Sequence, residues 1–165
     1  MLASIIVYLQ ILLGKILNKI ASSEIKYAKK YLILIKNALL ILITFVLIYS
    51  SLDFKLLIPF ILGFIIFKYF KKMYFLLGLL TFLSFTAKFT LLLLALASLF
   101  TLIHSSLTSL KPKEFILKSL YFILPFALIF IETFINQNSS IFIGLLAGGL
   151  IAQFKGPWLS LVEQQ

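Results

Sequence analysis

A single carboxylate inside a long apolar run, Glu132, is the residue best placed to do chemistry. A carboxylate in a membrane costs a few kcal/mol unless it is paired, protonated or hydrated. At α-helical spacings of three, four and seven, one face carries Glu132 together with four further residues, Lys118, Tyr121, Pro125 and Asn136. We therefore predict that these five residues line a substrate pathway. The alternative is that Glu132 and Asn136 only reach the membrane surface.

The one histidine, His104, is followed by Ser105, with Thr108 one turn further on. A histidine beside a hydroxyl could act as a general base toward a nucleophile, although this pairing is too common to specify an enzyme. The alternative is an interhelical hydrogen bond. The five acidic residues are scattered and the chain has no cysteine, so neither a paired-carboxylate Mg²⁺ site nor a thiolate metal site is expected. We expect no catalytic set, no metal and no cofactor.

Small residues recur at helical spacing in two apolar segments. One segment carries Ser98, Thr101 and Ser105, and the other carries Gly144, Gly148 and Ala152. Because lipid provides no hydrophobic drive for helix association, small residues at such spacings let two helix backbones approach closely. The pattern predicts helix packing, with a glycine-lined pore or a dimer face as the alternative.

The elements that position these residues must lie in a membrane. Of the 165 residues, 62% are hydrophobic and 12% are charged, whereas soluble domains are about half apolar and a quarter charged. The composition predicts an all-α integral membrane bundle, with residues 1–165 as one transmembrane domain. Runs of apolar residues predict helices at 2–21, 32–51, 54–70, 73–87, 89–110, 115–136 and 141–156. Lys15, Asn18 and Lys19 make the first run polar at one end, so it either spans or lies along the interface, giving seven spans or six.

Lysine sets the orientation. All 15 basic residues are lysine, and the connections between the predicted helices alternate between lysine-rich and lysine-poor. Lysine-rich loops stay in the cytoplasm, which predicts a multi-pass protein of a cell or inner membrane with an external N-terminus and a cytoplasmic C-terminus. These lysines are expected to face anionic lipid headgroups and not nucleic acid.

An internal repeat is a further hypothesis. Residues 56–65 align without a gap on residues 122–131, which places Pro59 on Pro125, and the same offset of 66 places Gly78 on Gly144. Segments 32–87 and 89–156 would then correspond, and with an odd number of spans in each they would have opposite orientations, giving a 1+3+3 inverted repeat. Chance identity is the alternative, because leucine, isoleucine and phenylalanine are so frequent here.

These observations favour a small transporter or channel for a solute or ion, with the polar face of the sixth predicted helix at its pathway. One alternative is an accessory or assembly subunit of a larger membrane complex, in which packing seams bind a partner subunit or a second copy. Another is a lipid-modifying enzyme that uses the lysine-rich surface and His104. The sequence specifies neither the substrate nor the oligomeric state.

Overall fold

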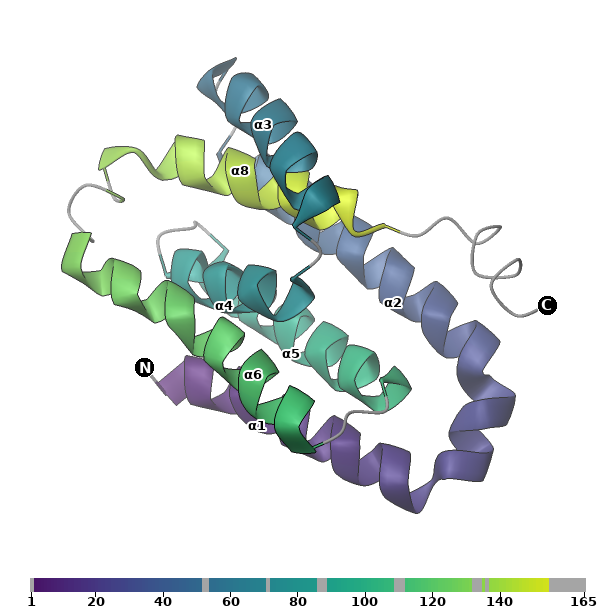
Figure 1. Ribbon diagram of the computed structural model, residues 1–165. Helices are drawn as coiled ribbons and strands as arrows, with labels where there is room; N and C mark the ends of the chain where they lie inside the picture. The colour runs from purple at the N-terminus through teal and green to yellow at the C-terminus, as the bar shows by residue number, and fades with distance from the viewer. Residues whose placement is uncertain are drawn as a thin grey trace.

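The computed structural model describes residues 2–51, 54–70, 72–85, 89–108, 112–131, 135 and 137–154. Within these ranges the chain is all-α, with seven α-helices, two 3₁₀ helices and no strand (Figure 1). The α-helices are α1 (Leu2–Ile20), α2 (Ser22–Ser50), α3 (Leu57–Tyr69), α4 (Met73–Ser84), α5 (Thr90–Leu107), α6 (Pro112–Ile123) and α8 (Ser139–Ala152). The 3₁₀ helices are η1 (Phe54–Leu56), which leads into α3, and η2 (Leu124–Ile131), which continues α6.

The helix α2 differs most from the sequence prediction at its start. It begins at Ser22, ten residues before the predicted position 32. The added turns contain Lys26, Lys29 and Lys30, and lysine is a good helix former. Apolar composition therefore marks the part of α2 suited to lipid and does not mark where the helix begins.

The prediction of one continuous α-helix over 115–136 is wrong. The α-helix α6 ends at Ile123 and continues as the 3₁₀ helix η2, with Pro125 as its second residue. Proline has no N–H to donate, so an α-helical hydrogen bond to Tyr121 cannot form. A 3₁₀ helix turns by about 120° per residue in place of about 100°. The α-helical spacing that grouped Glu132 and Asn136 with Lys118 is thus lost, and both of those residues lie outside the described ranges.

Pro59 acts differently from Pro125. It is the third residue of α3, where a backbone N–H has no partner within the helix in any case. Pro59 therefore fits the first turn of α3 without a kink, and the two aligned prolines do not interrupt their helices in the same way.

Two of the described helices, α2 and α5, are by length and composition able to cross a membrane. Two shorter apolar helices, α4 and α8, have 12 and 14 residues and measure about 18 and 21 Å, against a hydrocarbon core of about 30 Å. The chain therefore contains two candidate spans and two shorter apolar helices among its described residues.

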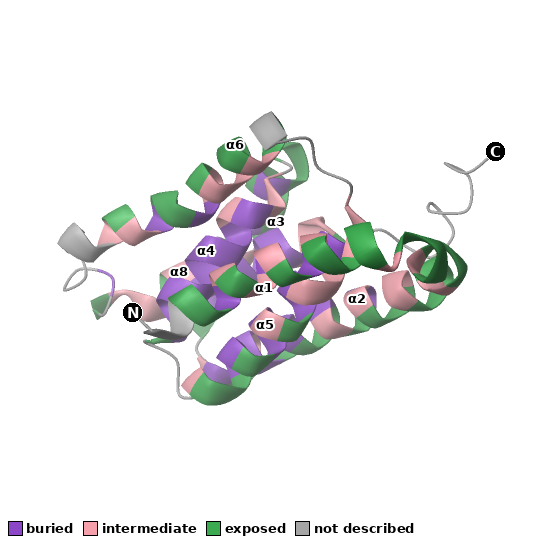
Figure 2. Ribbon diagram, turned by 90° about the horizontal axis from the view of Figure 1, so that it is seen from below, coloured by how far each residue is buried: buried purple, intermediate pink, exposed green. Residues whose placement is uncertain are grey.

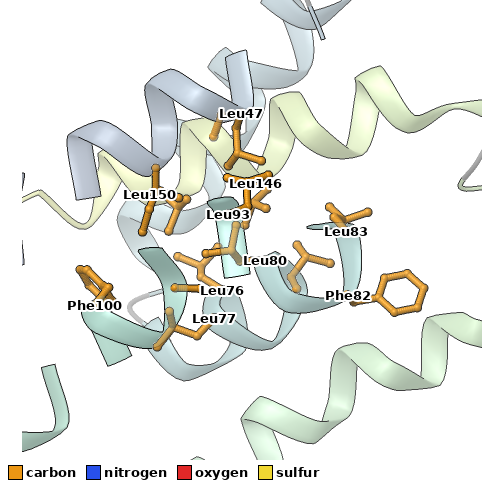
Figure 3. Close-up of a cluster of buried hydrophobic side chains, with 14 of the residues drawn as sticks. Leu47, Leu76, Leu77, Leu80, Phe82, Leu83, Leu93, Phe100, Leu146 and Leu150 are labelled. Carbon is orange, nitrogen blue, oxygen red and sulfur yellow. The ribbon is translucent and has the colours of Figure 1, made fainter. Parts of the chain in front are cut away.

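The short helices α4 and α8 form the centre of the bundle. Every residue of α4 from 76 to 84 is buried, and so are most residues of α8 between 143 and 150 (Figure 2). Leu76, Leu77 and Leu80 of α4 meet Leu146 and Leu150 of α8 in one cluster (Figure 3). Apolar helices of 10–14 residues are commonly buried core or re-entrant segments, and these two are buried within the protein.

The surrounding helices present apolar side chains outward. Phe45 of α2 is 65% exposed, Ile65 of α3 is 50% exposed and Leu117 of α6 is 50% exposed. Soluble monomers rarely expose extended apolar surface, so outward faces of this kind suit contact with lipid.

The first helix, α1, packs along α5. The Asn18 side chain donates to the backbone carbonyl of Ser106, and the Ser105 hydroxyl lies 3.2 Å from the carbonyl oxygen of Gln10. A Cβ on Gly14 would meet the Leu102 carbonyl at 2.6 Å, so only glycine permits this approach. At the polar end of α1, Asn18 therefore faces α5, whereas Lys19 is exposed.

Candidate functional site

The interface between α4 and α6 is built on one glycine. A Cβ on Gly78 would lie 2.9 Å from the carbonyl carbon of Phe122 and closer still to its oxygen, so the two backbones touch at this point. One turn further along, the Phe82 and Phe126 rings pack edge to face with centroids 6.3 Å apart. This contact fixes which face of α6 and η2 is turned toward α4.

The described members of the predicted pathway lie on this inward side of α6. The Lys118 ammonium stands 5.6 Å from the centroid of the Tyr74 ring, and the Lys72 ammonium stands 4.8 Å from that of Tyr121. Pro125 is buried. The other face of α6 carries four leucine and isoleucine side chains that are at least half exposed, namely Ile116, Leu117, Leu120 and Ile123. Three of the five predicted residues thus point into the protein, and Glu132 and Asn136 lie outside the part that the structure describes.

The predicted packing glycines face α3. A Cβ on Gly144 would lie 2.8 Å from the Leu56 carbonyl oxygen, and one on Gly148 would lie 2.8 Å from the Phe64 nitrogen. From the opposite side, a Cβ on Gly63 would lie 2.8 Å from the Cα of Leu145. Ala152 is half-buried against the core. Gly63 was not predicted, because an isolated glycine within a run of isoleucine and phenylalanine has no periodic partner in sequence.

The small polar residues of α5 have mixed roles. Ser98 and Thr101 donate to carbonyls of their own helix, those of Leu94 and Ala97, at 2.8 and 2.6 Å. Ser105 faces Gly14 of α1, and its hydroxyl also reaches the Gln10 carbonyl oxygen of α1. Ser105 therefore makes a contact between the two helices. The predicted seam is therefore a helix contact at Ser105.

The close contacts of the two halves correspond by the offset of 66. Gly144 abuts Leu56, and the residues 66 positions away in the other half, Gly78 and Phe122, abut each other as well. Equivalent segments also run in opposite directions along the bundle, α3 against η2, which continues α6, and α4 against α8 (Figure 1). The internal repeat itself stays a hypothesis, with which this correspondence of contacts is consistent.

A second pair of contacts obeys the same offset with different side chains. Gly148 lies against the backbone of Phe60, and the equivalent residues Phe82 and Phe126 form the ring pair described above. Glycine lets the α8 backbone contact α3 at this point, whereas two phenylalanine rings make the equivalent contact between α4 and η2. The two halves therefore share a contact pattern and differ in the side chains that make it.

His104 makes ring contacts. Its ring stacks on Phe100 with centroids 5.8 Å apart and lies 5.5 Å from Tyr74. The hydroxyls of Ser105 and Thr108 donate to backbone carbonyls of α5 and not to the imidazole. The arrangement of base and nucleophile that an enzyme would need is not formed among the described residues.

The predicted pathway did not include Lys15, Lys72 or Tyr74. Each of these residues contacts a predicted residue or one of its neighbours on α6. Lys15 of α1 stands over the Phe115 ring of α6 at 3.7 Å. These contacts depend on which helices pack together, and no local pattern in the sequence carries that information.

Groups of three or more histidine or acidic residues able to hold a metal ion do not occur in the described ranges. Comparisons with models of known families, with curated proteins and with solved structures returned no match.

Proposed function

We propose that this chain is a multi-pass integral membrane protein that moves a small solute or ion along a pathway between α4 and the continuous segment of α6 and η2. The observation that carries the proposal is the direction of the polar face of α6. Lys118, Tyr121 and Pro125 are turned toward the buried helix α4, while leucine and isoleucine cover the opposite face. Polar groups kept away from lipid in a membrane bundle mark pathways and binding sites more often than structural positions.

Membrane insertion rests on α2 and α5 and on the exposed apolar faces around the bundle. Together α6 and η2 measure about 34 Å, long enough for a crossing. The C-terminal ends of α1 and α5 and the N-terminal ends of α2 and α6 lie at one end of the bundle (Figure 1). These ends carry lysine-rich connections, which supports a cytoplasmic location for that end and an external N-terminus.

The correspondence of contacts between the two halves supports transport. Inverted repeats in transporters place the substrate between two similar units, which exchange their conformations as the site opens to one side and then the other. Here glycine makes a close backbone contact in each pair, Gly144 with Leu56 and Gly78 with Phe122. Two similar pairs of this kind are what such an exchange requires.

The accessory-subunit alternative has less support. A subunit that binds its partner through small residues would leave a small-residue face uncovered. Gly63, Gly144 and Gly148 instead contact backbone of this same chain.

Water access distinguishes the proposed pathway from a packed core. The chain has no cysteine, so a single Tyr121→Cys variant in lipid vesicles can be treated with a small hydrophilic thiol reagent. Its matched control is Leu120→Cys, because the Leu120 side chain is 58% exposed on the apolar face of α6. The pathway requires the thiol at position 121 to react and the thiol at position 120 to stay unmodified in lipid. An unreactive Tyr121→Cys variant would favour the accessory-subunit alternative.

A further inference from the structure

Three lysines from three different elements converge on the aromatic side chains of α4 and α6. Lys15 stands over Phe115 at 3.7 Å, Lys72 over Tyr121 at 4.8 Å and Lys118 over Tyr74 at 5.6 Å. Residues 115, 118 and 121 follow at intervals of three along α6, so the three ring contacts lie within two turns of this helix. We call Lys15, Lys72, Lys118 and Tyr74 the basic cluster.

The basic cluster has one acidic neighbour among the described residues, Glu114, which lies one turn before Lys118 on α6. Only Glu24 and Glu114 of the acidic residues fall in those ranges, and both side chains are exposed. A cation over an aromatic face gains about 0.5–2 kcal/mol, which holds the ammonium in place but does not neutralise it. The N–H groups that point away from the ring remain able to donate. The geometry therefore leaves positive charge gathered on the polar side of the bundle.

Tyr74 supports Lys118 with its ring. The Tyr74 side chain is 4% exposed, and its ring also contacts the His104 ring, with centroids 5.5 Å apart. The Thr108 side chain lies beside the Tyr74 hydroxyl and donates its own proton to the His104 carbonyl at 3.0 Å. The Thr108 oxygen is therefore the acceptor nearest to the Tyr74 hydroxyl, and Tyr74 contributes to the basic cluster through the ring face under the Lys118 ammonium.

The ring contacts of the basic cluster lie inside the first turns of α6. Lys118 and Tyr121 are six and nine residues beyond Pro112, the first residue of α6, or about 9 and 14 Å along the helix. Lys72 is the N-cap residue of α4, and its ammonium is directed onto the Tyr121 ring. Lys72 and Lys118 are both half-buried against rings of the neighbouring helix, whereas a lysine that only meets lipid headgroups extends outward.

We propose that the basic cluster binds a phosphate group at the cytoplasmic end of the α4–α6 interface. A phosphate carries about −1.5 to −2 charges at neutral pH and presents several acceptor oxygens, which suits a group of three ammonium donors. Lysine binds phosphate as a point charge, so the absence of arginine from the chain is compatible with this site. The phosphate can belong to a free anion or to a lipid headgroup. Binding of phosphate at this site does not depend on the proposed function. The assignment of a free phosphate anion as the substrate of the pathway rests on that function.

Binding is measured first. Purified protein in bilayer discs of phosphatidylcholine is equilibrated with radiolabelled inorganic phosphate, using the native chain and the variants Lys72→Gln, Lys118→Gln and Lys118→Arg. Lys29→Gln is the matched control, because Lys29 is exposed on α2 and belongs to the same lysine-rich end. We expect saturable binding that weakens at least about tenfold in both cluster glutamine variants, as loss of a charge-assisted hydrogen bond implies. Lys118→Arg and Lys29→Gln should keep it.

The lipid arm uses discs that also contain phosphatidylglycerol, and it measures which lipid co-purifies with the protein. Enrichment of phosphatidylglycerol that disappears in the cluster variants, without binding of free phosphate, assigns the same site to a headgroup. Absence of both kinds of binding overturns the site, and so does an equal loss in Lys29→Gln. Uptake of labelled phosphate into vesicles is scored separately. Binding without uptake would contradict transport of phosphate and leave the site standing.

Discussion

The contact between α8 and α3 makes Gly148→Ala a sensitive test of how closely these helices approach. The added Cβ would lie 2.8 Å from the Phe64 nitrogen and nearer still to the Phe60 carbonyl oxygen. Ordinary van der Waals contact begins at 3.4 Å, so the helices must separate by at least about 0.6 Å. A gap of 0.5–1 Å removes about a quarter to a half of the attraction between facing atoms.

The adjacent glycine is the matched control. A Cβ on Gly149 would meet only side-chain atoms, the Phe67 ring at 2.6 Å and the end of the Leu76 side chain at 2.9 Å. Each substitution gains about 1 kcal/mol from the higher helix propensity of alanine, and this gain cancels when the two variants are compared. Overpacking against backbone costs about 1–3 kcal/mol. Shifting the buried Phe67 and Leu76 side chains costs less, so Gly148→Ala should be the less stable variant by about 1–2 kcal/mol.

Thermal unfolding in one detergent measures the difference. For a chain of this size, 1 kcal/mol corresponds to about 2–4 °C in Tm. The reasoning requires Gly148→Ala to unfold at a lower temperature than Gly149→Ala. Equal midpoints, or a lower midpoint for Gly149→Ala, would refute the close contact of α8 with α3.

Two further outcomes follow from the same contacts and from the orientation. Gly78→Ala, like Gly148→Ala, should lower the unfolding temperature in the same detergent, because the added Cβ meets the Phe122 backbone. An unchanged midpoint would contradict the contact of α4 with α6. A cysteine replacing Ser139 should react with a membrane-impermeant thiol reagent applied from outside the cell, and protection from outside with labelling only after lysis would reverse the proposed topology.

Composition was sufficient to predict an all-α chain, because apolar runs in a membrane require helices that satisfy their own backbone hydrogen bonds. Every predicted segment except that of α2 begins within three residues of the first residue of an observed α-helix. It did not predict which apolar helices lie inside. The run that became α4 is no more hydrophobic than the preceding run, which became α3, yet α4 is buried and the outward face of α3 is exposed. Burial depends on packing partners, and in a chain this apolar the hydrophobic pattern does not distinguish lipid from protein.

The candidate site was predicted in part, for a physical reason that Pro125 illustrates. Spacing along an ideal α-helix correctly grouped Lys118 and Tyr121 on the face toward α4. Beyond Ile123 the change to a 3₁₀ helix alters the rotation per residue, so the same spacing no longer places Glu132. The lysines that complete the basic cluster, Lys15 and Lys72, come from other elements and become neighbours only through tertiary packing.

The central claim, a pathway that continues past the basic cluster between α4 and η2, is tested most directly by water access near the middle of the bundle. Pro125 itself shapes η2, so the cysteine is placed beside it as Phe126→Cys, at a side chain that is half-buried and faces Phe82 of α4. In sealed vesicles of known orientation, a membrane-impermeant thiol reagent is applied from each side in turn, with Ile123→Cys as the control, because Ile123 is 54% exposed on the apolar face. The pathway predicts that the Phe126→Cys variant is modified from both sides while the Ile123→Cys variant is not. Protection of the thiol at position 126 from both sides, with Tyr121→Cys still reactive, would describe a closed cytoplasmic recess and contradict a route across the membrane.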